Sequence, residues 1–171
     1  SRNDDIVGDL TSPFDIKNNG DVIGESNLRG LLWKKEKNGY LDLSTIISKY
    51  YPNPWRVVPF AMSDRVNGDI KITGFIQNII DNNVKSVVFI LDYSITNSKE
   101  VSFKLIEDIG GAGGYPWTLP QKILLDESLL SSYYYFDEYG YERSDSFLTS
   151  PKGNYENSIR FSEYLKKTGL N

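Results

Sequence analysis

The sequence contains no cysteine and no histidine among its 171 residues. Without cysteine there are no disulfides, zinc–thiolate sites, iron–sulfur clusters or thiol nucleophiles. Without histidine there is no Ser-His triad, no HExxH zinc site and no imidazole base. Because these residue types carry much of enzyme chemistry, we predict that the chain is not an enzyme and uses no metal or cofactor.

Long apolar runs and basic patches are also missing. The longest purely apolar run is residues 87–91, which is far too short to cross a membrane. The chain has 19 basic and 23 acidic residues, and its net charge is −4. It lacks the basic stripe that binding to a phosphate backbone needs. We therefore expect no transmembrane segment and no nucleic-acid partner.

The residues that are present indicate a folded, mainly β domain. Residues 69–107 contain three β-branched, apolar segments separated by turns, which predicts an antiparallel meander. The central segment, 85–95, is apolar on both faces, so a second layer must cover it. The sequence therefore predicts a two-layer antiparallel β-sandwich of six to eight strands.

The two ends of the chain have different compositions. Residues 1–26 are polar, rich in Asp, Asn and Gly, and have no sustained hydrophobic period, which predicts a flexible N-terminal tether. The remaining residues, 27–171, then form one domain. Residues 154–168 predict a single C-terminal helix that packs on the sandwich, with Asn154 as N-cap and Gly169 just past its end.

Two stretches are similar to known families. Residues 1–5, Ser-Arg-Asn-Asp-Asp, resemble the residues that follow the lipidated cysteine in surface lipoproteins of the Bacteroidetes type. This resemblance implies a cell-surface or periplasmic protein with a lipid anchor upstream of residue 1. Residues 73–78 and 84–93 resemble bacterial Ig-like modules of the FxLYD type, through a Gly-containing strand, an Asn, a short turn and a long apolar strand. That resemblance implies an Ig-like sandwich used for display or contact.

Aromatic residues gather in residues 131–141. Successive side chains of a strand point to opposite faces, so the tyrosines of 133–135 cannot all point into a core. Exposed Tyr and Trp rings offer flat apolar area with a polar tip, which suits contact with a protein or a sugar. The glycine-rich segment 110–114 precedes two more aromatic residues and is expected to place them at the same rim. The predicted ligand-binding residues are Tyr115, Trp117, Tyr133, Tyr135 and Tyr139.

These features predict a non-catalytic bacterial cell-surface or secreted binding module that contacts a protein or a glycan through an aromatic rim. One alternative is an acidic intracellular immunity or inhibitor protein that binds a basic partner by charge complementarity. The other alternative is a glycosidase built on carboxylates such as those of residues 126–127 and 137–138. A glycosidase would need two carboxyl groups that face each other across a cleft.

Overall fold

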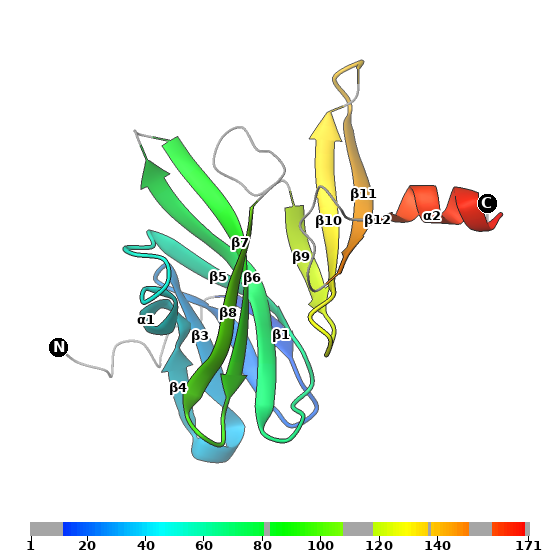
Figure 1. Cartoon of the computed structure of the whole chain (residues 1–171). Helices are drawn as coiled ribbons and strands as arrows, with labels where there is room; N and C mark the ends of the chain where they lie inside the picture. Colours follow the sequence, from blue (N-terminus) through cyan, green and yellow to red (C-terminus); the bar gives the residue numbers. More distant parts are fainter. Residues whose placement is uncertain (1–11, 81–82, 108–117, 137, 151–158, 170–171) are drawn as a thin grey trace.

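The computed structural model describes residues 12–80, 83–107, 118–136, 138–150 and 159–169. In these residues twelve strands form three antiparallel sheets of four strands each (Figure 1). The prediction of a mainly β, antiparallel protein is therefore confirmed, with three sheets where two layers were expected. Neither helix in this part of the chain has the length and apolar character needed to span a membrane.

Sheet A is a meander of the first four strands, followed by a short helix. Its strands are β1 (Ser12–Ile16), β2 (Val22–Ser26), β3 (Arg29–Lys34) and β4 (Gly39–Asp42), and the helix is α1 (Leu43–Ile47). A 3-10 turn, η2 (Lys35–Lys37), joins β3 to β4. The helix begins where Asp42 accepts a hydrogen bond from the backbone N–H of Thr45. The α1 side chains Leu43 and Ile47 are buried.

The structure differs from the tether that we expected over residues 1–26. Residues 12–26 form β1 and β2, and Ile23 is completely buried in the core between sheets A and B. Their polar composition is misleading because Asp21 and Glu25 are buried as ion pairs with arginines of other segments. Residues 1–11 lie outside the described residues.

Sheet B forms the middle of the molecule. Its strands, in order, are β5 (Arg56–Met62), β6 (Asp69–Ile80), β7 (Asn83–Ser94) and β8 (Lys99–Glu107), so the predicted meander of residues 69–107 is confirmed. Phe89 and Leu91 of β7 pack toward sheet A and α1, whereas Val88 and Ile90 belong to a second apolar cluster. This burial on both faces explains the continuous apolar run in β7.

Sheet C covers part of the other face of sheet B (Figure 1). Its strands are β9 (Thr118–Ile123), β10 (Leu129–Phe136), β11 (Glu142–Thr149) and β12 (Ile159–Arg160), and α2 (Phe161–Thr168) follows. The C-terminal helix is shorter than the predicted 154–168, because residues 159–160 pair with β11 as a strand. Gly169 ends it in the left-handed conformation, as expected, while Asn154 is outside the described residues.

An ion cluster complements the apolar contact between sheets B and C. The Nζ of Lys71 lies 2.5 Å from Oδ2 of Asp92 on the neighbouring strand and 3.2 Å from Oε1 of Glu127 in the β9–β10 turn. Burial by itself lowers the pKa of Lys71, but the hydrogen bonds to the two carboxylates outweigh it, and the pKa is raised overall. Lys71 therefore stays charged and links the turn of sheet C to sheet B.

We predict that Lys71→Met lowers the free energy of unfolding by about 2 kcal/mol, because Asp92 loses its charged hydrogen-bond partner. Hydrogen exchange in β9 and β10 should accelerate more than exchange in sheet A. The control is Lys122→Met, which removes an exposed lysine of β9 and should leave stability almost unchanged. Equal losses for the two variants, measured by urea denaturation, would contradict the role of the ion cluster.

Candidate functional site

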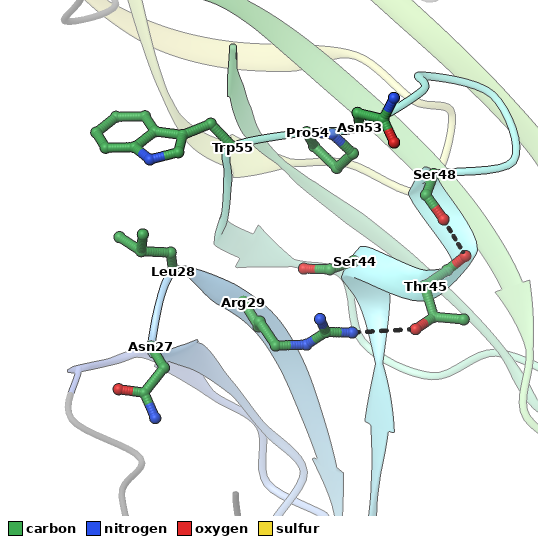
Figure 2. Close-up of a pocket in the computed structure, with 9 residues that line it drawn as sticks. All are labelled: Asn27, Leu28, Arg29, Ser44, Thr45, Ser48, Asn53, Pro54 and Trp55. Atoms are coloured by element: carbon green, nitrogen blue, oxygen red, sulfur yellow. Dashed lines mark hydrogen bonds between the residues drawn. The ribbon is translucent and has the colours of Figure 1, made fainter. Parts of the chain in front are cut away.

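A groove of about 330 Å³ lies where sheet A, α1 and the start of β5 meet (Figure 2). This volume is at the lower end of the range, about 300–1,000 Å³, that small-molecule sites occupy. Three short segments contribute to the groove: the β2–β3 turn, the helix α1 with its C-cap Ser48, and the loop before β5. The lining residues are Asn27, Leu28, Arg29, Ser44, Thr45, Ser48, Asn53, Pro54 and Trp55.

The β2–β3 turn forms one wall of the groove. Its two central residues, Asn27 and Leu28, have φ values of 49° and 67°, as in a type I′ hairpin turn. Asn adopts this left-handed conformation readily, but Leu does so rarely and at a cost. The carbonyl of Leu28 accepts a hydrogen bond of 2.9 Å from the N–H of Val57, which fixes the turn against β5. The fold thus holds Leu28 in a strained conformation with 42% of the residue exposed.

Trp55 forms the neighbouring wall. The loop before it contains Pro52 and Pro54, which remove two backbone donors and restrict the chain. The N–H of Trp55 donates to the carbonyl of Gln77 on β6 over 2.9 Å, so the backbone of Trp55 is held in place. Trp55 is nevertheless 43% exposed, and Figure 2 shows its side chain and that of Leu28 at the same end of the groove. This end is apolar.

The opposite end of the groove is polar but carries little net charge. Arg29 donates from Nε and Nη2 to Oδ2 of Asp42, at 3.0 Å for Nε, and from Nη2 to the Thr45 hydroxyl at 3.2 Å. The Ser44 hydroxyl accepts from the N–H of Gly30, and the Ser48 hydroxyl donates to the carbonyl of Thr45. The guanidinium is therefore neutralised by its own carboxylate, and three hydroxyl groups stand beside it (Figure 2).

A buried ion pair connects the segments that carry the two apolar walls. Arg56 binds Glu25 in a bidentate manner, with Nε and Nη2 at 2.6 and 2.8 Å from the two carboxylate oxygens. The Glu25 side chain is only 8% exposed. Glu25 lies two residues before the β2–β3 turn, and Arg56 directly follows Trp55. This pair therefore fixes the spacing between Trp55 and Leu28.

The structure places the predicted aromatic rim only in part. Tyr139 is 76% exposed, in the turn between β10 and β11, and it is not among the residues that line the groove. The register of β10 and β11 puts Tyr133 and Tyr135 on one face of sheet C and Tyr134 on the other. Tyr115 and Trp117 lie outside the described residues, as do the side chains of Tyr133 and Tyr135.

The residues that line the groove were not predicted as a site. One sequence feature could have indicated Trp55 as a site residue. It follows a Pro-Asn-Pro segment just before an edge strand, where a side chain is seldom covered. No sequence feature indicated Leu28, since leucine is not a typical turn residue. Arg29 gains its place only because β3 pairs with β4 and brings it to Asp42.

The described residues do not favour the glycosidase alternative. No carboxylate lines the Trp55 groove. A second hollow, of about 370 Å³, is lined partly by Glu36 and Asp64, but Glu36 has a side chain that is 61% exposed and pairs with Arg65 at 2.9 Å. This solvated ion pair is unlike the dehydrated setting of a general acid. In the ranges that the structure covers, no three Asp or Glu side chains are grouped to hold a metal ion.

We predict that Leu28→Gly stabilises the fold, because glycine adopts positive φ without the cost that leucine incurs there. The free energy of unfolding should rise by about 1 kcal/mol, measured by urea denaturation. A fall in stability would contradict the assignment of strain to this turn.

We also predict that Glu25→Gln lowers stability by about 2 kcal/mol, because Arg56 loses a charged bidentate partner. The matched control is Glu100→Gln, which changes an ion pair with Lys49 whose lysine is more than half exposed. That control should have little effect on unfolding, since exposed pairs contribute little. Similar losses in the two variants would show that burial of the Glu25–Arg56 pair is not decisive.

Comparisons with known proteins give no match for this chain. No protein family matches it, and neither a curated protein nor a solved structure is significantly similar to it. The resemblances of residues 1–5 and 73–93 therefore stay predictions, and the function has to be argued from the groove itself.

Proposed function

We propose that this chain is a non-catalytic binding module that contacts a protein or a glycan ligand at the Trp55 groove. The observation that carries the proposal is the division of the groove into an apolar end, with Trp55 and Leu28, and an uncharged polar end beside Arg29. A site of this kind buries the apolar side of a ligand and holds its orientation by hydrogen bonds. The proposal keeps the predicted contact function and moves it from the Tyr139 region to Trp55.

The rigidity of the groove supports binding. Hydrogen bonds from Trp55 to Gln77 and from Val57 to Leu28 fix both walls before a ligand arrives. A preformed site avoids the loss of conformational entropy that ordering a loop would require. Tryptophan adds a large contact area with only two side-chain torsions to fix. The free energy of binding is therefore not reduced by the cost of ordering the site.

The position of the module in the cell is part of the same proposal. The lipoprotein-like residues 1–5 support a bacterial cell-surface or periplasmic location, and the Ig-like resemblance of residues 73–93 supports a role in contact. A surface location would give an exposed Trp55 access to extracellular glycans and proteins. Labelling of intact cells with a membrane-impermeant reagent tests the surface location and fractionation tests the periplasmic one, and a protein found only in the cytoplasm would contradict the proposal.

We predict that Trp55→Ala reduces capture of ligand at least tenfold, because truncation of a central tryptophan typically costs about 2 kcal/mol or more of binding free energy. The measurement is binding of the soluble, labelled full chain to a glycan array, and capture of protein from a bacterial surface extract by the immobilised chain. Thermal unfolding should change little, since the ring is partly exposed and its backbone bond to Gln77 is retained.

The matched control is Tyr139→Ala, which removes a more exposed ring from the β10–β11 turn. Capture that survives Tyr139→Ala but not Trp55→Ala supports the groove. The reverse pattern would return the contact site to the predicted rim. Full capture by both variants, or no capture by the original chain, would overturn the proposed function.

A further inference from the structure

We propose that the Trp55 groove recognises a neutral sugar ring, and this inference rests on the proposed binding function. The proposal names a polyhydroxylated ring without carboxylate, phosphate or amine as the group that enters the groove. It is argued from the charge of the lining, from its hydrogen-bonding groups and from the shape of its apolar end.

The charge of the groove disfavours strongly ionic ligands. Arg29 is the one charged residue of the lining, and it is already paired with Asp42 through two of its nitrogens. An anionic ligand would have to compete with that carboxylate for the guanidinium. A cationic ligand would meet no carboxylate in the lining. A neutral ligand loses no charge solvation on entry and is therefore favoured.

The polar groups of the groove match hydroxyl groups. Asn27 and Asn53 each bring an amide, which can donate and accept hydrogen bonds. Ser44 accepts from Gly30, which leaves its O–H free to donate, and Ser48 donates to Thr45, which leaves its oxygen free to accept. A sugar hydroxyl donates and accepts in the same way, so several hydroxyls can be satisfied at once.

The apolar end of the groove matches the C–H face of a sugar ring. A pyranose presents C–H groups on its face and hydroxyls around its edge. Trp55 and Leu28, each more than two-fifths exposed, stand together at one end, while Ser44, Thr45 and Ser48 stand at the other (Figure 2). A ring stacked on Trp55 therefore turns its edge toward the hydroxyl groups. The volume of about 330 Å³ suits a small ligand better than a folded protein surface.

An extended peptide fits the Trp55 groove less well than a sugar ring does. Peptides that bind by strand addition need an open sheet edge, and those that bind as helices need a long apolar groove. The Trp55 groove is short and is bounded by a turn, a helix end and a loop. We therefore take Trp55-dependent capture of a protein as the competing outcome of the test.

The test is an NMR titration of the full chain with neutral methyl glycosides of glucose, galactose, mannose, fucose and N-acetylglucosamine. The chain has three tryptophans, so the indole N–H signal of Trp55 is assigned by its loss in Trp55→Phe. We expect at least one neutral glycoside to shift this signal in a saturable way. Trp55→Phe should keep part of the affinity through its ring, whereas Trp55→Ala should lose at least tenfold.

Parallel titrations use glucuronic acid, galacturonic acid, inorganic phosphate and glucosamine. Tighter binding of a charged probe than of every neutral glycoside would overturn this inference and leave the proposed function intact. The same holds if no neutral glycoside shifts the Trp55 signal while a protein is captured in a Trp55-dependent way. Absence of Trp55-dependent binding by both glycosides and proteins would overturn the inference and the proposed function together.

Discussion

The ion pair between Glu25 and Arg56 joins sheet A to sheet B at the place where the groove is built. Its two hydrogen bonds link the end of β2 to the start of β5, and the walls of the groove extend from these two points. A buried ion pair contributes little net stability, because desolvation of both charges offsets much of their attraction. Its role here is to fix the relative position of the two sheets. Apolar contacts alone would allow several positions, whereas a bidentate ion pair defines one.

Sheet B supports both of its neighbours through the alternation of β7. Phe89 and Leu91 anchor sheet A and α1, while Val88 and Ile90 anchor sheet C. Among the residues that the structure describes, the apolar cluster shared with sheet C is smaller than the one shared with sheet A, and Lys71, Asp92 and Glu127 add an ion cluster to it.

One short segment of the groove has a strained backbone. Leu28 occupies a backbone conformation that glycine or asparagine would adopt at lower cost. The compensation is an apolar side chain held beside Trp55 by a hydrogen bond from Val57. Strain of this kind persists only where the surrounding fold fixes the backbone, and it is common at binding sites. The nearby Arg29–Asp42 ion pair lies at the surface beside this segment.

Much of the fold could be read from local patterns. The apolar alternation of residues 69–107 was enough to predict three strands and a covering layer, because side-chain periodicity reports burial directly. The same reasoning failed for residues 12–26, where Asp21 and Glu25 are buried and the polar composition therefore reported solvent exposure wrongly. Their partners, Arg65 and Arg56, lie more than 30 residues away in sequence, beyond the reach of any local pattern.

The sequence by itself determined what chemistry the protein lacks, since the absence of cysteine and histidine needs no structure to interpret. It also predicted exposed aromatic rings near residues 131–141, and Tyr139 and Tyr141 in the β10–β11 turn are indeed exposed. Only the tertiary structure decided which ring stands in a groove. Trp55, Leu28 and Arg29 meet because β5 of one sheet packs against the β2–β3 turn of another, and contacts between distant segments leave no periodic trace along the chain.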